Sequence, residues 1–204
     1  MKTGPGVTRR QNPRGQGGRL RAEIVDAAFE VLDTEAISDG VTLRAAARAA
    51  GVTAPALYAH FANVDELRAA MRDSAFESMV HLADEAAAAA ADPAGELLLR
   101  ARSVVDFAVA HPARYRLMFT PIPGSSTEVG ERTFAALVDV LDRCVAARLS
   151  ASQDAVTDAA HVLAALQGLA VTRTTMTEFH WPALDVAVRD IVTRVARLIP
   201  PPMV

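Results

Sequence analysis

The 204-residue chain contains one cysteine, one tryptophan and two tyrosines, and aromatic residues make up only 5% of it. Because Cys144 is alone, no disulfide can form within the chain, which fits a reducing compartment and predicts a cytoplasmic location. Charged residues interrupt the apolar runs well before the length of a membrane span, and no apolar segment of the secretory type follows the basic N-terminus. Scarce aromatics and abundant alanine favour helix-on-helix packing over a sheet.

Motifs for catalysis and metal binding are also missing from the sequence. It contains no P-loop, GxGxxG, GxSxG or HExxH motif. The five histidines are scattered, with no i,i+4 pair and no cysteine at metal-ligand spacing, so neither a metal site nor a cofactor is predicted. We therefore expect a protein that is not an enzyme, and a small all-α enzyme with dispersed catalytic residues is left as an alternative.

Charge is distributed unevenly along the chain. The net charge is −3, but residues 1–22 hold six basic residues and no acid, so the remainder carries −9. A basic arm on an acidic body is the pattern expected of a nucleic-acid binder, and a solvated leader without a partner is the alternative. Glycine and proline in residues 1–18 predict a disordered arm. The candidate phosphate contacts in and beside this arm are Arg9, Arg10, Arg14 and Arg19.

Apolar residues recur at three- and four-residue spacing from residue 19 onward, as at Ile24, Ala28 and Leu32. Strand-like alternation is absent, so the pattern predicts an all-α fold with about nine helices. We expect a loop over residues 120–130, "TPIPGSSTEVG". The first predicted helix begins at residue 19, and two short helices follow over 43–50 and 53–61. A long helix begins at residue 65 and runs into the alanines 86–91. The remaining five are predicted over 93–110, 112–119, 131–149, 153–175 and 182–198.

Residues 42–61, "TLRAAARAAGVTAPALYAHF", predict two short helices joined by a tight turn. Thr42 and Thr53 are good N-caps, and Gly51 supplies a permissive backbone for the turn. The intervening alanines would let the two helices approach closely. Residues 51–61 contain no Lys, Arg, Asp or Glu, so this stretch is suited to shape and base contact rather than to charge. An ordinary helical corner within a bundle is the alternative.

Longer motifs around this stretch indicate a family. The stretch from Leu20 to Met71 resembles the DNA-binding domain of the TetR family of transcriptional regulators. Two motifs within it carry the resemblance, "IVDAAFEVLDTEAISDGVTL" and the following "AARAAGVTAPALYAHFANVDEL". "FAVAHPARYRLMF" and "LAALQGLAVTRT" resemble the ligand-binding region of one large subgroup, in which His usually stands at Gln167. The resemblance implies a homodimer that reads a palindromic double-stranded DNA operator, with a disordered arm over 1–18, a helix-turn-helix domain over 19–64 and a helical ligand-binding and dimerisation domain over 65–204.

By position, the resemblance places the recognition helix from Thr53 to His60. A slim alanine-rich face can enter a major groove about 12 Å wide, alanine or proline can contact thymine methyls, and a tyrosine hydroxyl can donate to phosphate. Val64 stands where the family often has Lys, which removes one usual phosphate contact. Tyr58 covering the small core and His60 as an uninvolved surface residue are the alternatives. The residues implied to contact DNA are Thr42, Arg44, Thr53, Ala54, Pro55, Ala56, Tyr58, Ala59 and His60.

Residues of the second half are candidates to line an effector cavity, with core packing as the alternative for each. Arg114, His161 and Gln167 are the polar residues that would orient a small apolar or amphipathic effector. The last two helices are expected to form a four-helix dimer interface, or else to pack within one subunit. The candidate ligand-binding residues are Phe107, Arg114, Tyr115, Met118, Phe119, Phe134, Leu137, Leu141, His161, Gln167, Met176 and Trp181.

The sequence thus predicts a ligand-responsive DNA-binding regulator. In the family that the chain resembles, such regulators are most often repressors. A helical ligand carrier or interaction protein with a degenerate helix-turn-helix is one alternative. A nucleoid-type DNA binder without a sensor is another.

Overall fold

The computed structural model describes residues 17–35 and 41–200 of the chain. Within these residues it contains nine helices and no strand beyond an isolated bridge between Ser150 and Leu198, which confirms the all-α prediction. The helices divide into two compact units, with the division between Met71 and Arg72. The predicted phosphate contacts Arg9, Arg10 and Arg14 lie outside the described residues.

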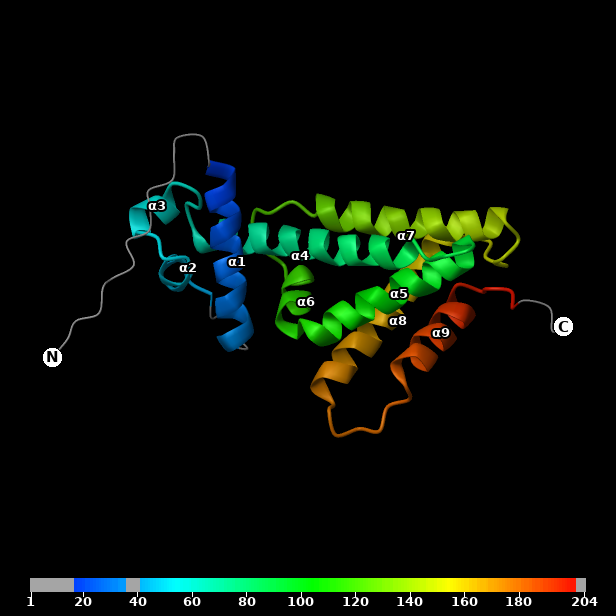
Figure 1. The fold of residues 1–204 in the computed structure, drawn as a ribbon. Helices are drawn as coiled ribbons and strands as arrows, with labels where there is room; N and C mark the ends of the chain where they lie inside the picture. The colour runs from blue at the N-terminus through cyan, green and yellow to red at the C-terminus, as the bar shows by residue number, and fades with distance from the viewer. Residues whose placement is uncertain (1–16, 36–40, 201–204) are drawn as a thin grey trace. The chain divides into compact units, whose positions relative to one another are not determined.

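The first unit is built on a fully buried core contributed by all its helices. In it, α1 packs against α2, and α2 packs against α3 (Figure 1). Its completely or almost completely buried residues are Ile24, Ala28, Leu32, Val41, Ala46, Leu57, Phe61, Leu67 and Met71. The helices are α1 (Gly17–Glu35), α2 (Leu43–Ala49), α3 (Ala54–Tyr58) and the first residues of α4 (Val64–Ala87).

The second unit contains the remaining residues of α4 and five further helices. Within it, α5 packs against α6, α7, α8 and α9, and α8 also packs against α7 and α9. The core of this unit therefore forms around α5 and α8, the two helices with the most neighbours. The five helices are α5 (Pro93–Ala110), α6 (Pro112–Met118), α7 (Glu128–Ala146), α8 (Ala155–Thr175) and α9 (Leu184–Val195).

Local sequence signals set most of the helix ends. Asp92 is extended and its side chain accepts from the Gly95 N–H, so it caps α5 with Pro93 at the first helical position. α4 ends at Ala87, so it runs into the alanines 86–91 as expected and stops within them. The observed bounds of α7, α8 and α9 differ from the predicted ones by up to three residues.

Among the residues that the structure describes, α8 is the one helix that is long and apolar enough to cross a membrane. It has 21 residues, its most apolar stretch of 18 residues has a mean hydropathy of 1.3, and by length and composition alone it could cross a membrane. This is more apolar than the sequence pattern suggested. In the structure α8 packs against α5, α7 and α9. A core helix of a soluble protein satisfies the same criteria, so this helix is weak evidence for a membrane span.

Candidate DNA-reading surface and effector cavity

Gly51 forms the turn between α2 and α3. Its φ of 64° lies in the left-handed region, which a residue without a Cβ adopts at little cost. The Gly51 N–H donates to the Arg48 carbonyl (3.2 Å), and the Val52 N–H donates to the Ala47 carbonyl (3.0 Å). These two bonds close the end of α2 in a Schellman motif. Gly51 therefore fixes the direction in which the chain leaves α2 and enters α3.

Threonine side chains start both helices of this motif, as predicted. The Thr42 hydroxyl accepts from the Ala45 N–H at 3.1 Å, and the Thr53 hydroxyl accepts from the Ala56 N–H at 3.4 Å. Each cap satisfies one N–H that the helix would leave unpaired. The sequence of the motif therefore specifies its own local geometry.

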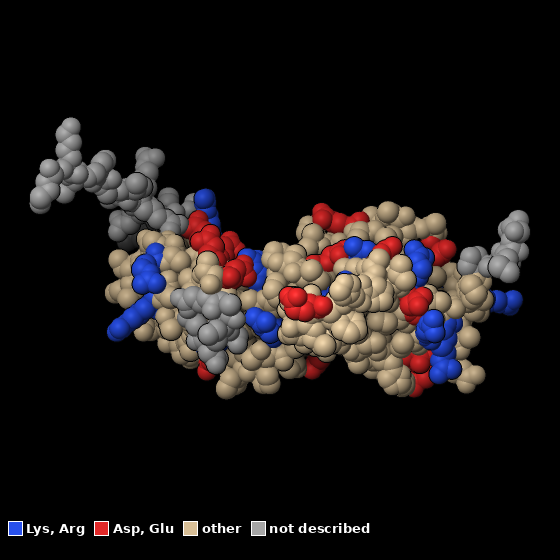
Figure 2. All heavy atoms as spheres, turned by 90° about the horizontal axis from the view of Figure 1, so that it is seen from below, with Lys and Arg blue, Asp and Glu red and all other residues tan. Residues whose placement is uncertain are grey.

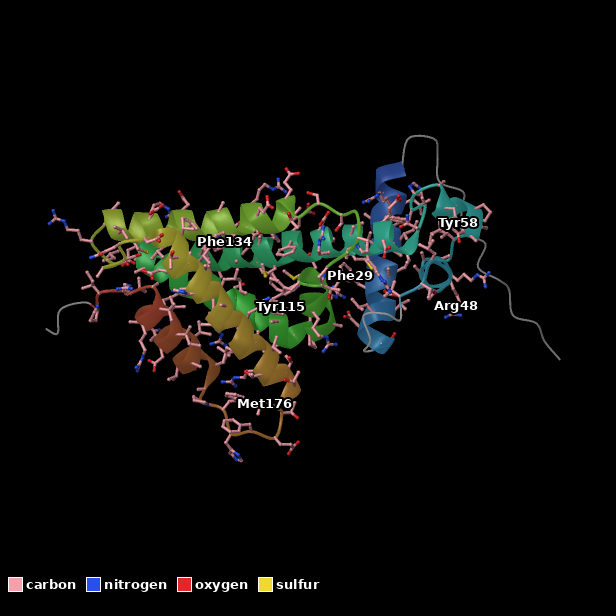
Figure 3. The ribbon with its side chains drawn as sticks, turned by 180° about the vertical axis from the view of Figure 1, so that it is seen from behind. Phe29, Arg48, Tyr58, Tyr115, Phe134 and Met176 are labelled. Carbon is pink, nitrogen blue, oxygen red and sulfur yellow. The ribbon has the colours of Figure 1, made fainter. Side chains whose placement is uncertain are left out.

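A buried core lies beneath α3, and it fixes which face of this helix is exposed. Leu57 and Phe61 are almost completely buried, and the Arg21 guanidinium lies 4.7 Å from the centre of the Phe61 ring. Tyr58 is 55% exposed and extends from α3 (Figure 3), which favours a surface role over covering the core. The other residues predicted to contact DNA in this helix are also accessible: Thr53, Ala54, Pro55 and Ala59 are exposed, and Ala56 and His60 are half-buried.

Positive charge in the first unit lies on the neighbouring helices rather than on α3. Arg44 and Arg48 are exposed on α2. Arg19 on α1 is exposed and forms an ion pair with Glu23 at 3.1 Å. On the face of the molecule in Figure 2, basic and acidic side chains are interspersed among uncharged ones. Among the described residues, the exposed face of α3 is therefore uncharged, and the arginines lie on the neighbouring helices.

A cavity of about 870 Å³ lies within the second unit. It is lined by α4, α5, α6, α7, α8 and the α6–α7 loop, with Tyr115 coming from α6 and Phe134 from α7 (Figure 3). The Phe119 ring lies 5.1 Å from the Tyr115 ring and 5.9 Å from the Phe76 ring, both edge-on. Of the predicted ligand-binding residues, the structure brings five together in this wall: Tyr115, Met118, Phe119, Phe134 and Leu137.

The other seven predicted ligand-binding residues do not line the cavity. Phe107 and Leu141 are buried in the core, and Phe107 packs on the His111 ring at 5.1 Å. On α8 the cavity wall is formed by Leu163 and Leu166, which leaves His161 and Gln167 on other faces of that helix. The remaining three residues outside the cavity wall are Arg114, Met176 and Trp181.

An ion-pair cluster that sequence reasoning missed closes part of the wall. Both terminal guanidinium nitrogens of Arg143 on α7 donate to the Glu96 carboxylate on α5, at 2.7 and 2.9 Å. Arg100 donates to Glu96 at 2.9 Å and to Asp84 on α4 at 2.5 Å. Hydrogen bonds from Arg143 and then Arg100 lower the pKa of Glu96 to about 2, although burial opposes the shift. The cluster connects α4, α5 and α7.

Arg72 is a second buried charge in the wall that the sequence did not reveal. It is 7% exposed and donates to the Ser125 hydroxyl at 2.9 Å and to the Ser126 carbonyl at 2.5 Å. It also forms an ion pair with Asp73 at 2.9 Å. Arg72 therefore connects α4 to the α6–α7 loop that covers the cavity.

Tyr115 and Cys144 are buried titratable groups of the second unit. Burial raises the pKa of Tyr115 to about 12 and that of Cys144 to about 11. Both groups are therefore neutral near pH 7, and Cys144 lacks the thiolate character of a reactive cysteine. No set of three or more His, Cys, Asp or Glu residues in the described ranges is arranged to hold a metal ion.

These features define a class: an all-α protein that joins a helix-turn-helix unit to a helical unit that contains a cavity. The sequence model for bacterial regulatory proteins of the tetR family matches residues 24–71, and the model for the tetracyclin repressor-like C-terminal domain matches residues 97–196. Together the two matches cover more than half of the chain. The chain belongs to the TetR family of transcriptional regulators.

Individual relatives agree with this assignment. YobS of Bacillus subtilis (strain 168), described as an uncharacterized HTH-type transcriptional regulator, is 30% identical over 126 residues, which are 61% of this chain. The match spans 64% of the length of YobS, less than two thirds.

Solved structures share the fold over nearly the whole chain. A protein of unknown function from Rhodococcus sp. RHA1 has a TM-score of 0.77 at 25% identity, over 92% of this chain and 98% of that one. PfmR, a TetR family transcriptional regulator from Thermus thermophilus, has a TM-score of 0.64 at 21% identity, over 87% and 99%. YobS and PfmR are thus described as regulators rather than as enzymes.

Proposed function

We propose that the protein is a DNA-binding transcriptional regulator of the cytoplasm, and that it acts as a dimeric repressor released by a small apolar or amphipathic effector. The observation that carries this proposal is the outer face of α3, which is accessible and uncharged over a sealed core. The exposed side chains of α3 are small apart from Tyr58, so the helix is narrow enough for a major groove about 12 Å wide. Arg44 and Arg48 flank it on α2, where phosphates would lie.

The cavity supports the sensor half of the proposal. Its volume of about 870 Å³ and its predominantly apolar wall suit a drug-sized ligand. α4 begins in the first unit, which contains α3, and continues into the second unit, where Phe76 and Met79 line the cavity. An effector that favours one arrangement of α4 would change operator affinity, provided that it binds the two conformations unequally.

Exposed apolar residues on the last two helices support the proposed dimer. Val156 and Val171 on α8 and Val186 on α9 are exposed, whereas Val162 and Val188 on the same helices are buried within the unit. Both helices therefore carry exposed apolar side chains that packing within their own unit leaves uncovered. A second copy related by two-fold symmetry could cover these faces and would match a palindromic operator.

The test is a gel-shift assay on the DNA that flanks the protein's own gene, at about 150 mM salt with an excess of unrelated DNA. We expect a discrete complex with the wild type and a loss of binding with Tyr58→Ala, while helical content stays unchanged. The control is Phe179→Ala, which alters an exposed aromatic residue in the other unit. Binding that is weak and independent of sequence would contradict the proposal and favour a ligand carrier.

A further inference from the structure

The Tyr115 hydroxyl is an unsatisfied polar group in the cavity wall. Tyr115 is only 3% exposed, and its hydroxyl has no hydrogen-bond partner among the residues that the structure describes. Buried polar side-chain atoms are normally paired, and an unpaired one is costly. Because burial keeps the phenol neutral, the group retains a proton to donate. What this position lacks is a hydrogen-bond acceptor.

The charged residues in the same wall already have partners. Arg72 is paired with Asp73, and the Glu96 cluster neutralises Arg100 and Arg143. The wall contains three arginines and three acids, so its formal charges balance: Arg72, Arg100, Arg143, Asp84, Glu131 and Asp139. An anionic ligand would have to compete with an existing ion pair and leave a carboxylate such as the partly buried Glu96 without its arginine. The wall therefore favours an uncharged ligand.

The rest of the wall is apolar and partly aromatic. Phe76, Phe119 and Phe134 offer ring faces and edges, and Met118 and Leu166 fill the spaces between them. Aromatic groups of a ligand could pack against such rings edge-on or offset. The wall therefore provides a large hydrophobic contact and few polar ones.

We propose that the effector is an uncharged, mainly aromatic or aliphatic molecule whose single carbonyl or ether oxygen accepts a hydrogen bond from Tyr115. This inference rests on the proposed sensor function and names the chemical class that the sensor detects. Tyr115 would then discriminate between a ketone and a hydrocarbon of the same shape.

The probes that test this are three matched compounds: 1,3-diphenylpropan-1-one, the hydrocarbon 1,3-diphenylpropane, and the anion 4-(3-oxo-3-phenylpropyl)benzoate. Binding to the purified full-length protein is measured by calorimetry without DNA. We expect the ketone to bind about tenfold more tightly than the hydrocarbon, the factor that corresponds to about 1.4 kcal/mol. We expect the anion to bind at least tenfold more weakly than the ketone.

Two tyrosine variants provide the internal comparison. Tyr115→Phe is expected to abolish the preference for the ketone and to leave hydrocarbon binding unchanged. Tyr58→Phe, on the exposed side chain of α3, is the matched control and should retain the preference. Because the Tyr115 hydroxyl is unpaired, the ligand-free Tyr115→Phe protein should unfold at the same temperature as the wild type or higher.

Each remaining outcome overturns the inference. These outcomes are a ketone preference that survives Tyr115→Phe, an anion that binds as tightly as the ketone, the failure of all three probes to bind, and a loss of ligand-free stability in Tyr115→Phe. The gel-shift assay is independent of this result. If the ketone binds as expected but no specific DNA complex forms, the ligand inference stands and the regulator proposal fails.

Discussion

Replacing Glu96 with glutamine is expected to destabilise the second unit by about 2 kcal/mol at pH 7. The pKa of Glu96 falls from 4.5 to about 2 in the folded protein, a difference that corresponds to at most about 3 kcal/mol. Glu96 itself is only 16% exposed, but its main partner Arg143 is 44% exposed, so solvent screening reduces the value. Glutamine keeps the shape and loses the charge that holds both arginines.

The pH dependence gives a sharper test of the same reasoning. Because the pKa of Glu96 is lower in the folded state, its contribution is complete above the unfolded pKa of 4.5 and is lost as the pH falls toward about 2. The difference in unfolding free energy between wild type and Glu96→Gln should therefore shrink by more than half between pH 7 and about pH 3.

The assay is urea unfolding followed by the fluorescence of Trp181, the only tryptophan and a residue of the same unit. Glu77→Gln, at an exposed position on α4, is the control and should leave the unfolding free energy within about 0.5 kcal/mol of wild type. A pH-independent difference, or no difference at pH 7, would refute the assigned role of the cluster.

Three further predictions concern the arm, the reading helix and one helix end. Deleting residues 1–18 should weaken DNA binding and retain the sequence preference. It should also reduce the slope of log binding constant against log salt concentration by about 0.9 per lost phosphate contact. Binding titrations at several salt concentrations measure this slope, and an unchanged slope would contradict the prediction. Tyr58→Phe should weaken all DNA sites similarly, whereas Ala54→Ser should change which site is preferred in competition assays; a change of preference in the first would count against the phosphate role. Arg148→Gly should raise the unfolding free energy by about 1 kcal/mol, because Arg148 has a φ of 59°; thermal unfolding would show an equal or lower midpoint if this is wrong.

The helix-turn-helix could be predicted from the sequence because its determinants are local. Thr42, Gly51 and Thr53 act on N–H and carbonyl groups within five residues of themselves, so their residue types alone indicate the caps and the turn. Spacing also predicted all nine helices within the described residues, because each helix buries a periodic face.

The cavity could be predicted only in part because its wall comes from residues far apart in the sequence. Phe76 and Phe134 are separated by more than fifty positions, and only packing brings them to one wall. On α8 almost every face is apolar, so periodicity could not show that Leu163 and Leu166 line the cavity while Gln167 does not. The bond between Glu96 and Arg143 spans 47 residues and leaves no local signal.

Selection of binding sites from random double-stranded DNA tests the central claim most directly. If two copies of α3 read DNA around a two-fold axis, the purified protein should enrich an inverted repeat whose half-sites lie about one helical turn apart. Tyr58→Ala should enrich the same repeat more weakly or not at all. Enrichment of no sequence, or of a single half-site by a monomeric protein, would contradict the account of this chain as a dimeric DNA-reading regulator.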